Sequence, residues 1–348
     1  MSSLHEYVEK LQASDESERV YAAEDIGYLN TPDGVPPLLD RLCQEPSLAV
    51  RDAIFQALIR MDGDTAIEGS VGLLSSEDPQ IRNQAVEVLR RKGARPIPFL
   101  QAVMNTGGKD LRKLVLDVLS GLQSGDARDI YAVALADRDP NVVITAVENL
   151  GRMRAEEFRG RIEELLLADS HPMLTAACLD ALVGIGHESS LAAIRRRFPE
   201  LAALPDFLLA SCLKAMAALG SDREFAEVAG LLAVRSPHLR PAILGALLAI
   251  GPRCPSPGPG DLLPALRVVA ENGDAPLCRY QAVRVLGFWA SRDDVYPFLV
   301  ASLASPERMV RLGAAEALRS AERPGLDEIL AARARKESDG EVLQALGR

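Results

Sequence analysis

The sequence predicts an all-α protein, a right-handed solenoid of about ten stacked helix pairs with a C-terminal cap. Two features of composition support this. Apolar residues make up 48% of the chain but aromatic residues only 4%, and such a composition suits closely packed helices better than sheets. The 348 residues also exceed the usual size of a single core. The third observation is a motif that recurs throughout the chain, as expected of a repeat array.

The repeat is seen when segments such as QIRNQAVEVLRRKG (80–93) and MVRLGAAEALRSA (309–321) are aligned on a shared arginine. The aligned positions, called anchors below, are Arg19, Arg51, Arg82, Arg112, Val143, Thr175, Leu209, Arg240, Arg279 and Arg311. Successive anchors lie 30 to 34 residues apart, except for an interval of 39 after Arg240. The residues three and seven places after every anchor are apolar. A chain that is 48% apolar does not produce that pattern by chance.

Each unit reads as a short helix, A, followed by a second helix, B, that starts near the anchor. Apolar residues at +3, +4 and +7 from the anchor form one stripe of helical period. The B helices are expected to start at prolines, which suit the first helical turn, with a polar N-cap before some of them. The prolines are Pro79, Pro140, Pro172, Pro237 and Pro276, and the expected caps are Asp78, Asp139 and Ser236. Glycines at +11 are expected to end four B helices, namely Gly93, Gly186, Gly220 and Gly251.

We predict one continuous solenoid over residues 1–348. The Pro- and Gly-rich stretch 252–261 is expected to be an enlarged loop between repeats, because the same pattern resumes in register at Arg279. Residues 323–348 supply an A helix and a truncated, more polar B helix, which we expect to form the C-terminal cap.

One unit carries a recognisable family pattern. Its residues are Asp78, Pro79, Ile81, Arg82, Ala85, Leu89 and Gly93. This pattern resembles HEAT-like repeats, in particular the short bacterial type found in phycobilisome (PBS) lyase proteins. A less full match occurs at Pro140, Ala146, Leu150 and Gly151, where Val143 replaces the arginine. The resemblance covers almost the whole chain and implies a solenoid whose B helices line the concave side. It is specific for fold and not for function, because solenoids carry unrelated activities.

Two aligned positions of the repeat, the anchor and +5, are candidates for structural or binding roles. The set of +5 residues is called the acidic column below. The anchor arginines lie on the packed side of B, so we expect their guanidinium groups to pair with a carboxylate or carbonyl of a neighbouring repeat rather than to form a ligand-binding row. Position +5 falls on the exposed side and is acidic in five of the first six units. It indicates either an acidic ridge that binds a basic segment of a partner, or a solvated face neutralised by Arg90, Arg91 and Arg152.

The sixth to eighth B helices carry almost no charge. Their positions +1, +2 and +9, expected on the exposed side, hold Ala176, Ala177, Gly184, Ala210, Ser211, Ala218, Pro241, Ala242 and Ala249. These small residues either permit tight curvature or form an apolar floor for a partner helix or hydrophobic tail. Tyr280, Phe288 and Trp289 follow and are expected at the edge of that floor, although Trp289 suits the core equally well. The candidate partner-binding residues are Glu24, Glu87, Asp117, Glu148, Asp180, Ala210, Ala242, Tyr280, Arg284 and Phe288.

The sequence predicts no catalytic, metal-binding or cofactor-binding residue. It has no P-loop, GxGxxG, nucleophile elbow or HExxH motif. HEAT-like iron hydroxylases bind metal through recurring His-Glu pairs, and only His5-Glu6 and His187-Glu188 occur here. Cys43, Cys178, Cys212, Cys254 and Cys278 contain no CxxC pair, which favours a reducing compartment. Cys178 and Cys212 are expected in the core, and Cys254 and Cys278 at the surface.

A net charge of −10 argues against nucleic acid or an anionic membrane as partner. The first residues lack the pattern of a signal peptide and no apolar run is long enough for a membrane span, so we predict a cytoplasmic protein. We expect a non-catalytic scaffold or adaptor that binds a protein partner, through a basic segment or an apolar helix, on its concave face. Oligomeric state is left open.

Two alternatives follow from the resemblance. One is an enzyme or enzyme subunit of the bilin-lyase type, which handles the chromophore of phycobiliproteins. The other, more remote, is a HEAT-like DNA glycosylase. Those enzymes bind DNA on a basic face lined with aromatic residues, which an acidic chain with one tryptophan does not match.

Overall fold

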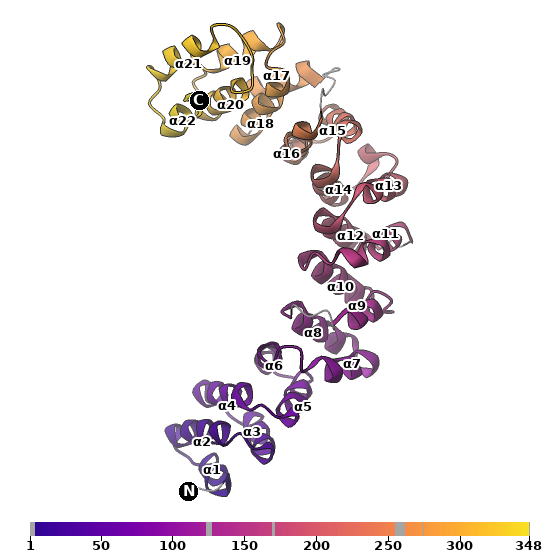
Figure 1. Ribbon diagram of the computed structural model, residues 1–348, viewed down its shortest axis with the longest axis vertical. Helices are drawn as coiled ribbons and strands as arrows, with labels where there is room; N and C mark the ends of the chain where they lie inside the picture. The colour runs from indigo at the N-terminus through magenta and orange to yellow at the C-terminus, as the bar shows by residue number, and fades with distance from the viewer. Residues whose placement is uncertain (1–3, 123–126, 169–170, 255–261, 274, 348) are drawn as a thin grey trace. The chain divides into compact units, whose positions relative to one another are not determined.

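The computed structural model describes residues 4–347 apart from 123–126, 169–170, 255–261 and 274. Within these residues the regular structure is helical, from α1 to α22, with short turns and 3-10 helices between (Figure 1). Backbone contacts divide the chain into two compact units, unit 1 (Met1–Met153) and unit 2 (Arg154–Arg348). Each unit is described by itself.

Unit 1 consists of helix pairs in which a shorter A helix precedes a B helix. The A helices are α1 (Leu4–Lys10), α3 (Val35–Leu42), α5 (Asp64–Leu73), α7 (Ile97–Thr106) and α9 (Arg128–Ala134). The B helices are α2 (Glu16–Leu29), α4 (Leu48–Arg60), α6 (Pro79–Arg91), α8 (Lys109–Ser120) and α10 (Pro140–Arg152).

Unit 2 continues the same alternation. Its A helices are α11 (Arg159–Ala168), α13 (Glu188–Arg197), α15 (Asp222–Val234), α17 (Leu262–Asn272), α19 (Tyr296–Ser302) and α21 (Leu326–Ala334). Its B helices are α12 (Pro172–Ile185), α14 (Asp206–Leu219), α16 (Arg240–Ile250), α18 (Pro276–Leu286), α20 (Arg308–Leu318) and α22 (Gly340–Leu346).

Within each unit the helices form two layers. Each B helix packs on the next B helix along the chain, from α2 to α10 in unit 1 and from α12 to α22 in unit 2. A helices contact their neighbours in the same way, for example α3 with α5 and α15 with α17. The prediction of an all-α solenoid is therefore confirmed.

The core lies between the two layers, where the repeat predicts it. The residues at +3 and +7 of the ten anchored B helices, from Ala22 and Ile26 to Ala314 and Leu318, are all at most 1% exposed. Burial of this aliphatic ladder removes apolar surface from water in every repeat, which is the main favourable term in folding.

Helix ends follow the predicted signals with one exception. The helices α6, α10, α12 and α18 begin at the expected prolines, and the caps Asp78 and Asp139 accept backbone N–H groups. Pro237 instead begins a separate 3-10 turn, Pro237–Leu239, and Ser236 makes no side-chain cap bond. Helix α16 starts three residues later because Pro241 occupies its first turn.

The spacing of the B helices depends on residue size where they meet. A methyl group added at Gly27 of α2 would lie 2.8 Å from the Cα of Ala57 in α4, and one added at Gly287, after α18, would lie 2.8 Å from the Cβ of Ala317 in α20. These helix pairs make the most extensive B–B contacts among the described residues of each unit. Helices α4 and α6, with Ile59 and Val88 at the corresponding positions, contact each other much less closely.

The predicted enlarged loop is only partly visible. Gly251 ends α16 and begins a 3-10 turn, Gly251–Arg253, while 255–261 lie outside the described residues. The predicted terminal segment holds α21 and the short α22. The single continuous array, the loop at 252–261 and the cap at 323–348 remain predictions.

Candidate partner-binding face

The anchor arginines connect consecutive repeats, as predicted. Five of them pair with a carboxylate that lies just before the next B helix: Arg19 with Glu45, Arg51 with Asp78, Arg112 with Asp137, Arg279 with Glu307, and Arg311 with Glu337. The same guanidinium groups also donate to carbonyls of the loop before their own helix, as Arg112 does to Gly107 O at 2.8 Å. Each of these five arginines therefore holds two successive loops together.

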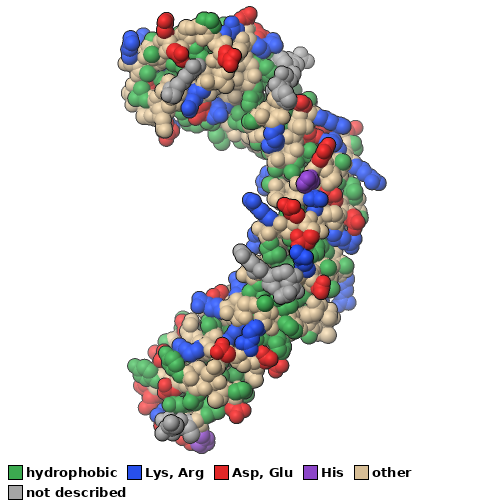
Figure 2. Space-filling model, viewed as in Figure 1, with side chains coloured by type: hydrophobic (Ala, Val, Ile, Leu, Met, Phe, Trp, Pro, Cys, Tyr) green, Lys and Arg blue, Asp and Glu red, His purple; other side chains and the backbone are tan. Residues whose placement is uncertain are grey.

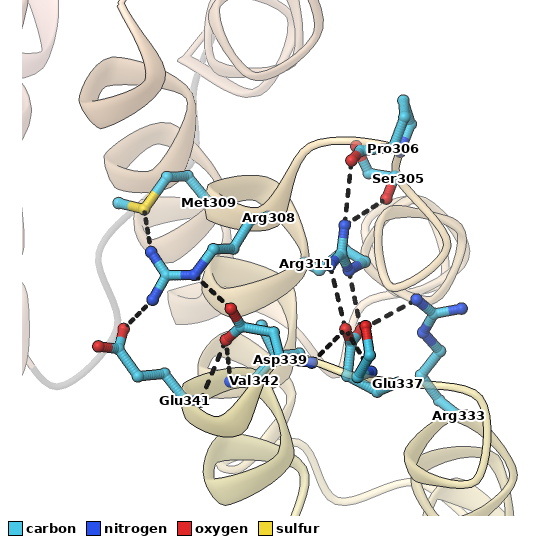
Figure 3. A network of polar contacts seen from close by, with 11 residues as sticks. Ser305, Pro306, Arg308, Met309, Arg311, Arg333, Glu337, Asp339, Glu341 and Val342 are labelled. Atoms are coloured by element: carbon cyan, nitrogen blue, oxygen red, sulfur yellow. Dashed lines mark hydrogen bonds and ion pairs between the residues drawn. The ribbon is translucent and has the colours of Figure 1, made fainter.

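Figure 3 shows the last of these networks. Arg311 donates to both carboxylate oxygens of Glu337, at 2.8 and 3.0 Å, and Arg333 donates to the same group. The Arg311 hydrogen bond is the main reason that the pKa of Glu337 falls to about 2. It acts with the backbone N–H groups of Asp339 and Ser338 and outweighs burial, which alone would raise that pKa.

Three of the five acceptor carboxylates share a position that was not predicted from the sequence, whereas Asp78 and Glu307 are the N-cap residues themselves. Glu45, Asp137 and Glu337 each lie two residues before an N-cap residue and accept its backbone N–H. Two anchor arginines do not pair with a carboxylate of the next repeat among the described residues. Arg82 donates only to carbonyls of its own loop, and the Nε of Arg240 is buried without a partner among the described atoms.

In unit 1 the predicted acidic column is not uniform. Glu24 and Glu148 are exposed and have no ionic partner among the described residues. Glu87 is half-buried and pairs with Arg91 at 2.8 Å. Asp117 is also half-buried, and burial raises the pKa of its carboxyl. Open carboxylates therefore lie at the two ends of the column.

In unit 2 the +5 side chains of consecutive repeats pair with each other. Asp180 accepts from Lys214 of the next repeat at 3.3 Å. Arg284 pairs with Glu316 of the next repeat, and the hydroxyl of Tyr280 lies between them, donating to Glu316 at 2.7 Å and accepting from Arg284 at 2.8 Å. Burial, with Glu316 close by, raises the pKa of Tyr280.

A hollow of about 510 Å³ lies beside this cluster. Arg284, Phe288, Trp289, Arg292 and Glu316 are among its lining residues. Phe288 and Trp289 pack edge to face on each other and on Phe225 of α15, with ring centroids about 6 Å apart. Trp289 is buried and belongs to the core, whereas Phe288 is half-buried. The structure thus brings Tyr280, Arg284 and Phe288 together.

The small-residue stretch is less exposed than expected. Ala242, Ala249, Gly184 and Ala218 are exposed and Ala210 is half-buried, but Ala177 and Ser211 are buried. Position +2 was placed on the exposed side, and for these two residues that is wrong. The reason is that α12, α14 and α16 pack closely, so the neighbouring B helix covers this position.

Sequence reasoning missed an aromatic and apolar area in unit 1. Tyr21, Tyr28 and Leu48 are 66%, 69% and 64% exposed, and the guanidinium of Arg60 stacks 4.0 Å above the ring of Tyr28. Hydrophobic side chains lie beside acidic ones at the surface of α2 and α4 (Figure 2). A groove of about 490 Å³ opens nearby between α4 and α6.

The cysteines require one correction. Cys178 and Cys212 are fully buried as predicted, and burial raises the pKa of Cys212 to about 12. Cys254 and Cys278, expected at the surface, are also buried. Cys278 precedes its anchor by one residue, a core position that Ile81 also fills. Cys254 is drawn against the end of α16, where its thiol donates to Ile250 O.

Across the described residues, no group of three or more His, Cys, Asp or Glu is placed to hold a metal ion. A search of the same residues finds no helix with the length and apolar character needed to span a bilayer.

Comparison with known proteins identifies the repeat. The family model for HEAT repeats matches residues 6–90 and 263–348. The chain is a HEAT-repeat protein. Over 71 residues, 20% of its length, it is 37% identical to "Bilin biosynthesis protein PecE" of Mastigocladus laminosus, and the match covers 26% of that protein.

Solved structures agree on the fold. The HEAT-repeat chain superposes on importin beta with a TM-score of 0.61 at 12% identity, covering 98% of this chain and 56% of importin beta. For Kap121p the TM-score is 0.56 at 13% identity, covering 99% of this chain and 44% of Kap121p. The chain therefore spans well under two thirds of each of these relatives. At such identities the likeness is one of fold alone.

Proposed function

We propose that this HEAT-repeat protein is a non-catalytic cytoplasmic scaffold that binds a protein partner on the outer face of its B-helix layer. The term denotes the exposed side chains at +1, +2, +5 and +9 of the B helices. The observation that carries the proposal is the exposure of Glu24 and Glu148 without ionic partners among the described residues, together with the exposed rings of Tyr21 and Tyr28, which share α2 with Glu24. Aromatic side chains among charges are typical of protein interfaces.

Three further observations support this proposal. The described residues hold no group placed to bind a metal ion, and five of the seven anchor arginines are paired with a carboxylate of the next repeat. None of the five cysteines, all within the described residues, is in a disulfide, which suits a reducing compartment. In unit 2 we propose that the exposed Ala242, the half-buried Ala210 and the Tyr280–Arg284–Phe288 cluster form the more apolar B-helix face of that unit.

Charge reversal on the B face tests the proposal. We expect the triple variant Glu24→Lys, Glu87→Lys, Glu148→Lys to lose at least about tenfold in affinity for the partner isolated from the native cell, because like charges across an interface cost several kcal/mol. Affinity is measured by surface plasmon resonance at two salt concentrations, and binding to the wild type should weaken as salt rises.

A matched control lies on the A helices. Asp40, Glu68 and Asp129 are exposed, and no ionic partner faces them in the described part of the chain. Changing all three to Lys alters the net charge by the same amount and should leave affinity within about twofold. Equal losses in both triples would show that only net charge matters, and no loss in the B-face triple would refute the proposed face.

A second candidate is a bilin-handling function, favoured by the 71-residue similarity to PecE. This function requires the chain to bind a free linear tetrapyrrole, which a visible absorption titration detects directly. A saturable shift of the bilin spectrum would favour it over a purely protein-binding role.

A further inference from the structure

The groove lies between α4 and α6, two helices that contact each other less extensively than α2 and α4 do. Where α2 meets α4, Gly27 and Ala57 let the backbones approach closely. In the next pair Ile59 and Val88 stand at the equivalent positions, and the helices are held apart. Between α6 and α8 a similar gap is filled by Arg90, which donates to Asp117 O and covers Gly121. Between α4 and α6, Lys92 donates to Ile59 O at the C-terminal ends of the helices, and the groove lies beside their N-terminal halves.

The groove has an apolar side and a polar side. Its lining residues are Leu48, Arg51, Asp52 and Phe55 from α4, and Gln80, Ile81, Asn83 and Gln84 from α6. Phe55 and Ile81 are buried and form the floor, while Leu48 is 64% exposed at the rim. Its volume of about 490 Å³ falls within the range of ordinary ligand sites.

The charge of the groove is negative. Arg51 is already engaged, because it donates to Glu45 O at 2.6 Å and to Asp78 at 2.8 Å. Asp52 is exposed and has no ionic partner among the described residues. Unit 1 as a whole contains 24 Asp and Glu against 16 Lys and Arg. An occupant that carries Lys or Arg is therefore favoured over an acidic one.

The side-chain amides in the groove indicate whether the bound segment is helical or extended. Asn83 and Gln84 are exposed, and their side chains make no hydrogen bond within the described structure. A side-chain amide offers a donor and an acceptor together, which matches a peptide group that is free to pair. The backbone groups of an α-helix are already bonded internally, whereas those of an extended segment are free.

We propose that this groove binds an extended segment of a partner protein in which an apolar side chain is flanked by Lys or Arg. The apolar side chain enters the groove over Phe55 and Ile81, the flanking cation pairs with Asp52, and the amides of Asn83 and Gln84 pair with the peptide backbone. The proposal rests on the protein-binding function proposed above and names one site and one ligand class for it.

Methyl-detected NMR of the full chain tests the assignment. The probe is the peptide Gly-Ser-Lys-Leu-Lys-Ser-Gly, and the reporters are the methyl groups of Leu48 and Ile81. We expect saturable shifts of both signals, and no comparable shifts with Gly-Ser-Glu-Leu-Glu-Ser-Gly or with Gly-Ser-Lys-Ser-Lys-Ser-Gly. The first comparison tests the charge of the ligand and the second tests its apolar side chain.

Variants then test the residues named. Asp52→Asn should weaken peptide binding about three- to fivefold, the range expected of an exposed ion pair. Leu48→Ser should weaken it about fivefold through lost apolar contact. Asp40→Asn, on the A helix α3, should change nothing. Both groove residues are exposed, so these variants keep the fold.

Three results would overturn the assignment: no saturable shift at Leu48 and Ile81, equal binding of the acidic peptide, or indifference to Asp52→Asn and Leu48→Ser. The charge-reversal triple of the previous section changes none of the residues that line the groove. If that triple abolishes partner binding while the groove binds no peptide, the scaffold function stands and the groove assignment falls. If the peptide binds while the triple has no effect, the groove assignment stands and the proposed scaffold function falls.

Discussion

At the scale of single residues, the anchor arginine is the most informative position of the chain. Its helical direction predicts a buried stem and an engaged guanidinium, and five of the seven arginines pair with an acid of the next repeat. Which acid is used was not predicted, because the acceptor sits in a loop whose path depends on the fold. The pattern of an acid two residues before an N-cap, seen at Glu45, was nevertheless present in the sequence.

The Glu337 network predicts a pH dependence of stability. The pKa of Glu337 is about 2 in the folded protein against 4.5 for a free side chain. Its contribution is therefore complete above pH 4.5 and is lost as pH falls from 4.5 toward 2. Glu337→Gln should lower the stability of the terminal repeats by about 2–3 kcal/mol at pH 7, measured as a shift in urea midpoint.

The control is Glu341→Gln. Glu341 also pairs with an arginine but is 68% exposed, so its loss should cost less than about 1 kcal/mol. The difference between the wild type and Glu337→Gln should shrink as the midpoint is followed from pH 4.5 downward. A difference that stays constant through that range would show that charge is not what this glutamate contributes.

At the scale of helices, most starts and ends follow local chemistry. Prolines and aspartate caps predict α6 and α10 correctly, whereas Pro237 failed because a second proline, Pro241, sets the start of α16. The spacing between B helices is a property of pairs of residues in different repeats. It could be found only after the structure showed which positions, such as Gly27 and Ala57, face each other.

Replacing glycine with alanine should have opposite effects on stability at two positions. Gly27→Ala should destabilise unit 1 by about 1–3 kcal/mol, because the new methyl group would lie 2.8 Å from the Cα and Cβ of Ala57. Gly72→Ala, in the exposed part of α5 where nothing lies within 4 Å, should stabilise by about 0.5–1 kcal/mol. Urea unfolding of both variants measures the sign. Destabilisation of equal size at both sites would contradict the close-approach explanation.

At the scale of the whole molecule, the fold was predictable and the binding face only partly so. The repeat predicts the core at +3 and +7 because burial follows helical periodicity directly. The acidic column was predicted from the same periodicity, but its chemistry depends on neighbours that periodicity does not report. Glu87 and Asp180 have ionic partners, whereas Glu24 and Glu148 have none among the residues that the structure describes. No sequence motif predicts the groove beside Leu48.

Charge differs between the two units. Unit 1 has a net charge of −8, from 16 basic and 24 acidic residues, and unit 2 of −2, from 23 and 25. A basic partner should therefore be attracted first to unit 1, and its association rate should fall with ionic strength.

Site-specific photo-crosslinking in the native cell tests the central claim most directly. A benzophenone side chain is placed at Gln56 and at Ala242 on the B helices, and in matched variants at Ala102 and at Ala226 on the A helices, all four exposed positions. The proposed function predicts covalent partner adducts from the B-helix positions and none from the A-helix positions. Adducts formed only from Ala102 or Ala226, or equally from both layers, would contradict a scaffold that binds through its B-helix face.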